Sequence, residues 1–257
     1  TAMHQVAIDG DVELAQVLRG RESAGIEPLV PEAALEVPLL GVAAEGAFGG
    51  KRAPVRVTLI DREVGRLLAE LEAGGRLDRT IVVFTSDHGD CLGAHGHSQK
   101  WTMYEEVVRV PMIVWAPRVL RGRGEVAQLV QAIDIAPALL ELAGCSVPEW
   151  WETRSVLPAL RGEAFEGRSA VYCEQGRDVV FQFSDFVSML RTDRWKFVHF
   201  LGESFGQLFD LADDPLEERD RWSDPDLRST REALRDQWMQ WRLDSAYRAR
   251  DWADAFR

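Results

Sequence analysis

Residues 80–90 read TIVVFTSDHGD, an apolar, β-branched run followed at once by two carboxylates, an imidazole and a glycine. A short run of this kind over residues 80–85 predicts a strand that is buried on both faces of a sheet. Asp87 and His88 then fall at the carboxyl end of the strand, where open α/β sheets bind their ligands. One carboxylate oxygen and one imidazole nitrogen suit a divalent metal, although a helix cap beside a surface histidine is an equally simple interpretation.

The chain on either side of this stretch alternates between helical and strand patterns. Spaced apolar residues predict an amphipathic helix over 60–71, and an apolar run predicts a second strand over 110–117. A further helix is expected over 133–142, with Asp134 as its N-cap and Gly144 at its end. Helix, strand, loop, strand and helix in this order predict an α/β fold with a doubly wound sheet.

The C-terminal part of the chain has shorter runs with turn residues between them. They predict a small antiparallel sheet, with strands over 169–174, 186–191, 195–200 and 207–211. A helix is then expected to begin near Ser223, and its apolar stripe favours packing over ligand binding. The stripe consists of Leu227, Arg231, Leu234, Trp238 and Trp241.

Three regions follow from these patterns. Residues 1–54 form an unassigned region. In it we expect a short helix over 12–18, followed by a long connection rich in proline and glycine. Residues 55–165 are expected to form the α/β part, and residues 166–257 the small sheet with its C-terminal helix.

The composition narrows the classes of partner. The chain has 257 residues and a formal net charge of −12, from 30 Lys+Arg and 42 Asp+Glu, which argues against nucleic acid as a partner. No apolar stretch is long enough to span a bilayer and no signal peptide is visible, so we expect no membrane partner and a cytoplasmic location. Three cysteines are too few for a disulfide framework.

Cationic side chains crowd the loop after Asp87 despite the acidic balance of the whole chain. Residues 87–100 hold three of the five histidines, His88, His95 and His97, together with Lys100. Imidazole and ammonium groups gathered at a strand end predict a site for an oxyanion.

The order and spacing of these residues resemble the sulfatase family within the alkaline phosphatase-like superfamily. The shared pattern is Ser-Asp-His-Gly-Asp after a strand, Leu-Gly-x-His-Gly, Lys, Tyr-Glu-Glu and Arg-Val-Pro. It is present here at residues 86–90, 92–96, 100, 104–106 and 109–111. The resemblance extends over roughly residues 55–220, and it implies part of an alkaline-phosphatase-like sheet followed by the family's small closing subdomain.

The resemblance also implies roles for single residues. Asp87 and His88 correspond to two ligands of one divalent metal, Ca²⁺ above all, with Mn²⁺ or Mg²⁺ as alternatives. Lys100 corresponds to the catalytic lysine that binds the sulfate oxygens and the nucleophile, while His95 and His97 are candidates for catalytic side chains lining the pocket. Tyr104, Glu105 and Arg109 are expected to form a structural network instead.

Two elements that the family places before the Asp-His-Gly segment are missing from the sequence. They are an Asp-Asp pair of metal ligands and the Cys/Ser-x-Pro/Ala-x-Arg motif whose Cys or Ser becomes the formylglycine nucleophile. Cys91, Cys145 and Cys173 do not lie in that motif. We therefore expect a C-terminal portion, as a truncated product, one chain of a split enzyme or a degenerate homologue.

Three functions remain open. The first is metal-dependent hydrolysis of a small anionic sulfate ester, and the second is hydrolysis of a phosphonate or phosphate ester by the same groups. The third is a non-catalytic, metal-binding remnant. Because half of a sheet exposes an edge, we expect the chain to need the missing N-terminal portion, a partner chain or self-association, and to be inactive alone.

Overall fold

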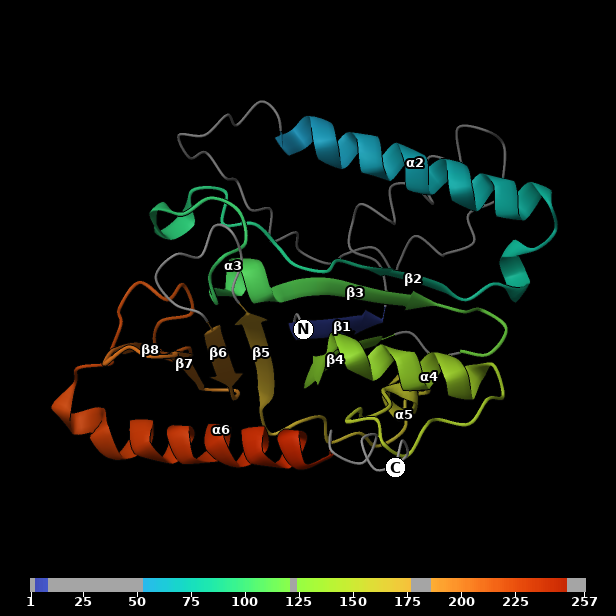
Figure 1. The fold of residues 1–257 in the computed structure, drawn as a ribbon. Helices are drawn as coiled ribbons and strands as arrows, with labels where there is room; N and C mark the ends of the chain where they lie inside the picture. Colours follow the sequence, from blue (N-terminus) through green and yellow to red (C-terminus); the bar gives the residue numbers. More distant parts are fainter. Residues whose placement is uncertain (1–2, 9–52, 121–123, 177–185, 249–257) are drawn as a thin grey trace, which may run out of the picture.

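The computed structural model describes residues 3–8, 53–120, 124–176 and 186–248, which form two four-stranded sheets with helices on their faces (Figure 1). The first sheet has the strand order β2-β3-β1-β4. β1 pairs with β3 in parallel, and the other two pairs are antiparallel, so the sheet is mixed. Its strands are β1 (Met3–Ile8), β2 (Val82–Thr85), β3 (Arg109–Trp115) and β4 (Gly124–Gln131).

The two strands expected in this sheet, β2 and β3, are present, but two others lie outside the predicted elements. β1 falls in the unassigned N-terminal region, and β4 does not alternate strictly, because Val126, Val130 and Gln131 are buried while Gln128 between them is exposed. Pairing with β1 makes this segment a strand. The prediction that β2 is buried on both faces is wrong for the described residues, because β2 is an edge strand and Val82–Phe84 are only half-buried.

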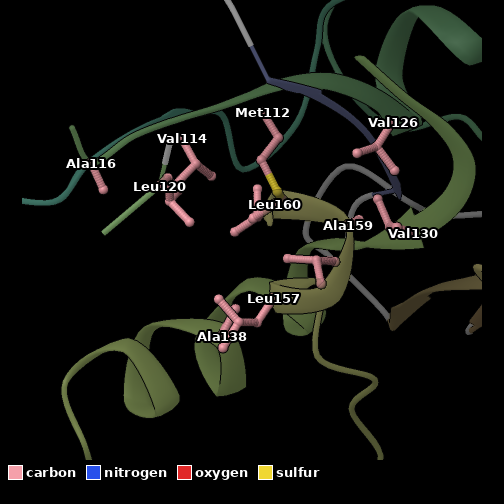
Figure 2. Packing of buried hydrophobic residues seen from close by; sticks show 11 residues of the cluster. Met112, Val114, Ala116, Leu120, Val126, Val130, Ala138, Leu157, Ala159 and Leu160 are labelled. Atoms are coloured by element: carbon pink, nitrogen blue, oxygen red, sulfur yellow. The ribbon is translucent and has the colours of Figure 1, made fainter. Parts of the chain in front are cut away.

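Helices lie on both sides of the first sheet (Figure 1). The predicted helix α2 (Ala53–Ala73) runs along one side, followed by a short 3₁₀ turn, η3 (Leu77–Arg79). On the other side lie α4 (Ile135–Leu142), which follows η5 (Ala132–Asp134), and the short α5 (Leu157–Leu160). Figure 2 shows the core between α4, α5 and the sheet, in which Met112 of β3 points toward Leu160 of α5.

Asp134 is the N-cap residue of α4, as predicted, but its side chain makes no capping hydrogen bond to that helix. Its side chain is 1% exposed and accepts hydrogen bonds from the backbone N–H groups of Gln131 (2.9 Å) and Arg154 (2.8 Å). The guanidinium of Arg168 pairs with the same carboxylate. Because a buried carboxylate must be paired, this cluster ties η5 to the segment that leads into the second sheet.

The second sheet has the order β5-β6-β7-β8 and is antiparallel throughout, as predicted. One face packs against Leu234 of the C-terminal helix, and the other against Met103 and Val108, which lie in the segment before β3. The elements are β5 (Val171–Gly176), β6 (Phe186–Arg191), β7 (Trp195–Phe200), β8 (Gly206–Asp210), η6 (Pro225–Leu227) and α6 (Arg228–Arg248).

The apolar stripe of α6 packs as predicted. Leu227, Leu234 and Trp238 belong to the cluster beneath the sheet, and Trp241 stacks on Tyr172 with ring centroids 4.1 Å apart. The predicted helix over 12–18 lies outside the described residues. Among the helices that the structure does describe, none is long and apolar enough to cross a bilayer.

Candidate functional site

Asp87 and His88 follow the last residue of β2 at its carboxyl end, as the sequence predicted. The Asp87 side chain is 84% exposed and that of His88 is 36% exposed, so both can be reached from solvent. Asp87 Oδ2 lies 3.6 Å from His88 Nε2. Two donor atoms this close together can bind a single cation.

The hydrogen bonds of His88 decide which ring nitrogen is free. Nδ1 lies 2.7 Å from the carbonyl oxygen of Gly89, and because a carbonyl can only accept, Nδ1 must carry the proton. In the neutral ring Nε2 then keeps its lone pair, on the side that faces Asp87. A backbone carbonyl that orients the ring in this way is the usual outer partner of a metal-binding histidine.

The charges around Asp87 favour its ionised form. Loss of solvation raises the pKa of its carboxyl, but the adjacent His88 ring, the backbone N–H of His88 and the charge of Lys100 together hold the pKa below its ordinary value. Lys100 itself is exposed at the end of the same loop. The structure thus places Asp87, His88 and Lys100 at one surface.

The loop between Asp90 and Gln99 is closed by hydrogen bonds from its backbone N–H groups, two of them to the Asp90 carboxylate. Asp90 Oδ1 accepts from the N–H groups of Leu92 (2.8 Å) and Gln99 (3.0 Å), and Cys91 N–H donates to the Gln99 carbonyl (3.0 Å). His95 has the left-handed φ of 53°. Hydrogen bonds within the loop therefore fix its shape. This shape sets the positions of His95 and His97.

His95 and His97 occupy different environments. His95 stacks on Tyr104, with ring centroids 3.7 Å apart and planes 5° apart, and its Nε2 lies 3.5 Å from Glu106 Oε2. His97 is exposed, and its ring centroid is 6.2 Å from that of Tyr104. His97 is thus the freer of the two, while the stacked ring of His95 also contributes to packing; their catalytic role stays a prediction.

Gly89 joins the site to the short helix α3 (Glu105–Val108). The Gly89 N–H donates to the Val107 carbonyl at 2.8 Å, and a Cβ atom at Gly89 would lie 1.8 Å from the Glu106 carbonyl oxygen. Only glycine allows two backbones to approach so closely. The glycine beside the candidate ligands therefore serves this contact.

The predicted structural network is present around Tyr104 and Glu105. Tyr104 Oη accepts from Gln207 Nε2 (3.1 Å), and burial raises the pKa of its hydroxyl. Glu105 Oε1 lies 2.8 Å from Lys196 Nζ on β7, and Lys196 Nζ also lies 2.7 Å from Glu217 Oε1. Lys196 and Glu217 fall in the stretch that resembles the family's closing subdomain, but the sequence assigned them no role, because their partner is about a hundred residues away along the chain.

The two carboxylates of this cluster differ in pKa. Burial raises the pKa of Glu105, but the charges of Lys196 and Arg191 outweigh it, and the net pKa lies below the ordinary value. Burial raises the pKa of Glu217 more than Lys196 lowers it. Glu105 is thus the more firmly ionised partner of the buried ammonium.

The cysteines do not supply a nucleophile. Burial raises the pKa of the thiols of Cys91 and Cys173, which keeps them neutral, and Cys173 packs in the core between the sheets. Cys145 is exposed and far along the chain from the loop.

The donor atoms of Asp87 and His88 fit a divalent metal as part of a larger ligand set. One carboxylate and one neutral imidazole with a fixed Nδ1–H suit such an ion. Within the described residues, no group of three His, Cys, Asp or Glu side chains could hold a metal ion.

Comparisons with known proteins identify the family of the chain. The family described as "N-sulphoglucosamine sulphohydrolase, C-terminal" matches residues 93–244. N-acetylglucosamine-6-O-sulfatase of Bacteroides thetaiotaomicron is 33% identical over 165 residues, which cover 63% of this chain and 30% of that protein. The chain thus spans about a third of the length of this relative.

Solved structures share the fold. A putative sulfatase from Bacteroides thetaiotaomicron superposes with a TM-score of 0.66 at 28% identity, over 75% of this chain and 43% of that one. A phosphonate monoester hydrolase from Silicibacter pomeroyi has a TM-score of 0.68 at 24% identity, over 94% and 50% of the two chains, and shows the fold alone.

Fold and site together define an alkaline-phosphatase-like α/β protein of the sulfatase class. Within that class, the chain belongs to the N-sulphoglucosamine sulphohydrolase C-terminal family. Membership suggests a divalent metal, as the sequence predicted. The family match begins at Gly93, just after Asp87 and His88, so the assignment of these two ligands rests on their own geometry.

Proposed function

We propose that this chain forms the C-terminal part of a metal-dependent sulfatase-like hydrolase that acts on a small anionic sulfate ester. The observation that carries this proposal is the pair of Asp87 Oδ2 and His88 Nε2, 3.6 Å apart at the end of β2, with the ring fixed by its bond to Gly89. The chain's similarity to an amino-sugar sulfatase supports an amino-sugar sulfate as substrate.

Each charged group has a distinct part in this function. Asp87 and His88 hold the metal, and the carboxylate favours Ca²⁺, with Mn²⁺ and Mg²⁺ as the alternatives. The bound metal supplies positive charge to the oxygens of the ester. Lys100 binds the sulfate oxygens and stabilises negative charge on them, and His97, at the exposed rim, is the freer candidate to exchange a proton with substrate.

The site needs further groups beyond these residues. Two ligands bind a cation weakly, and the described residues offer no third. We propose that the remaining ligands and the nucleophile come from a segment or chain that adds to the sheet beside β2, the edge strand next to the ligand pair.

A Ca²⁺ titration of the purified chain tests the ligand pair. We expect shifts of the His88 ring signals in NMR spectra, and Asp87→Ala should weaken the response at least about tenfold because it removes one of two ligands. Asp78→Ala is the matched control. Asp78 is an exposed carboxylate in η3, at the opposite end of β2 from Asp87. Equal Ca²⁺ responses in Asp87→Ala and the unaltered chain would rule out the assignment.

The second candidate is a phosphonate or phosphate ester hydrolase. Sulfate and phosphonate are both tetrahedral oxyanions, so the same cations serve either, and the shared fold with a phosphonate monoester hydrolase is compatible with it. Competition between inorganic sulfate and methylphosphonate for the Ca²⁺-loaded chain separates the two candidates. Tighter binding of sulfate, lost in Lys100→Ala, supports the first function, and tighter binding of methylphosphonate supports the second.

A further inference from the structure

Lys196 is a fully buried lysine in the middle of β7, with 0% of its side chain exposed. Successive residues of a strand point to opposite faces, so Lys196 lies on the face of Val198, toward Met103 and Val108, and not on the face of Phe197 under α6. A buried ammonium is unfavourable unless each of its protons finds an acceptor.

Three acceptors surround the Lys196 ammonium. Its Nζ donates to the Met103 carbonyl at 2.9 Å and lies 2.8 Å from Glu105 Oε1 and 2.7 Å from Glu217 Oε1. Glu217 Oε2 in turn accepts from the backbone N–H of Glu105 at 2.7 Å. These contacts hold residues 103–105, which lead into α3, against the second sheet.

The other side of α3 contacts the candidate ligands. Gly89 N–H donates to the Val107 carbonyl, and the Gly89 backbone lies so close to Glu106 that no side chain fits between them. Gly89 also supplies the carbonyl that orients the His88 ring. A continuous chain of contacts therefore runs from Lys196 through α3 and Gly89 to His88.

Stability alone does not explain a charged cluster at this place. Replacing a buried ion pair or triad by apolar residues of similar volume is often neutral or stabilising. What the cluster provides that an apolar group cannot is a fixed position for the Met103 carbonyl and the Glu105 N–H, because hydrogen bonds are directional.

We propose that Lys196, together with Glu217, is a positioning residue that holds α3 against Gly89 and thereby fixes the Asp87–His88 pair for metal binding. The second sheet then supports the metal site through α3. This inference rests on the proposed function, because it takes Asp87 and His88 as ligands.

Lys196→Met tests the proposal, since methionine keeps the length of the side chain and removes the charge. Mn²⁺ is the probe, and paramagnetic broadening of the His88 ring signals gives its affinity. We expect the affinity to fall at least about tenfold, because Gly89, whose carbonyl orients the His88 ring, loses its fixed position. The amide exchange of Gly89 should also become at least about tenfold faster, because its bond to Val107 loosens.

Arg194→Met is the matched control. Arg194 precedes β7 and pairs with Asp210 at 2.7 Å, so its loss removes an ion pair of the same sheet away from α3. We expect its Mn²⁺ affinity and Gly89 exchange to remain those of the unaltered chain, even where its loss of thermal stability equals that of Lys196→Met. A purely structural role for Lys196 predicts equal effects in the two variants and would overturn the proposal.

A second variant covers a failure of Lys196→Met to fold. Glu217→Gln keeps the shape of the side chain and removes its charge, and we expect faster Gly89 exchange and weaker Mn²⁺ binding in this variant also. If the unaltered chain shows no Mn²⁺ effect at His88, the proposed function fails, while Gly89 exchange still decides the link from Lys196 to the loop. Unchanged exchange and binding in both variants would refute the link itself.

Discussion

The roles of Gly89 and His88 depend on the contacts that these residues make beside the candidate ligands. Gly89 follows Asp87 and His88, and its sequence position suggests a turn. The structure shows instead that the backbone of α3 lies where a Cβ would be. His88 is likewise defined by one hydrogen bond, which leaves Nε2 free to face Asp87.

Gly89→Ala should therefore disturb both stability and the ligand pair. The added Cβ would lie 1.8 Å from the Glu106 carbonyl oxygen, so the loop or α3 must move. We expect a loss of at least about 1–3 kcal/mol in the free energy of unfolding, as for overpacked cores, measured by urea denaturation. Gly93→Ala is the control for adding a methyl group nearby, because no atom lies within 4 Å of a Cβ there, although its φ of 104° adds strain. A Gly89→Ala protein with native stability and an unchanged His88 environment would contradict the packing argument.

Among the elements, α6 shows how one helix separates a packing face from a solvent face. Leu234 is 5% exposed beneath the second sheet, and Trp238 Nε1 donates to Ser188 Oγ at 2.8 Å. Leu243, two turns or so further along the helix, is 61% exposed. The periodicity of the sequence identifies the packing face, because buried positions on a helix recur every three to four residues.

Leu234→Ala and Leu243→Ala make the same chemical change on the two faces of α6. We expect Leu234→Ala to cost about 2–5 kcal/mol of unfolding free energy through lost burial and a residual cavity. Leu243→Ala should stay within about 0.5 kcal/mol of the parent, as is usual for exposed positions. Urea denaturation followed by tryptophan fluorescence measures both. Equal losses in the two variants would mean that α6 does not pack on the sheet through Leu234.

At the scale of the whole molecule, the two sheets meet at the loop that carries the site. Met103 and Val108, on either end of α3, pack with Val171, Val187 and Val198 of the second sheet. The segment that carries α3 and contacts Gly89 is thus packed against the second sheet. On the opposite side, β2 is an edge strand among the described residues, and the proposed ligand pair Asp87 and His88 lies at its end.

We therefore expect the purified chain alone not to hydrolyse an aryl sulfate. Attack on a sulfate ester needs a nucleophile as well as positive charge, and Asp87, His88 and Lys100 provide charge only. Turnover by the unaltered chain should equal that of Lys100→Ala in a chromogenic assay with Ca²⁺ or Mn²⁺. Metal-dependent turnover that His88→Ala abolishes, in material free of any second chain, would overturn this expectation and reveal a nucleophile.

The amino-acid sequence by itself determined the elements whose signals are local. The bounds of β6 and β7 were predicted as residues 186–191 and 195–200 and are observed there. The strand end at Asp87-His88 and the packing stripe of α6 were also predicted. These features follow from alternation, helical periodicity and a closely spaced motif, all of which are properties of neighbouring residues.

Only the tertiary structure decided the features that depend on distant residues. β1 pairs with β3 and with β4, which makes both β1 and β4 strands, and the side chain of Asp134 pairs with Arg168 instead of capping α4. In the sequence, Lys196 is one lysine of a predicted strand. Only the folded structure brings Met103 and Glu217 to its ammonium group. The physical reason is that burial, charge pairing and backbone contact depend on which segments are neighbours in space. Local sequence patterns do not specify these tertiary contacts.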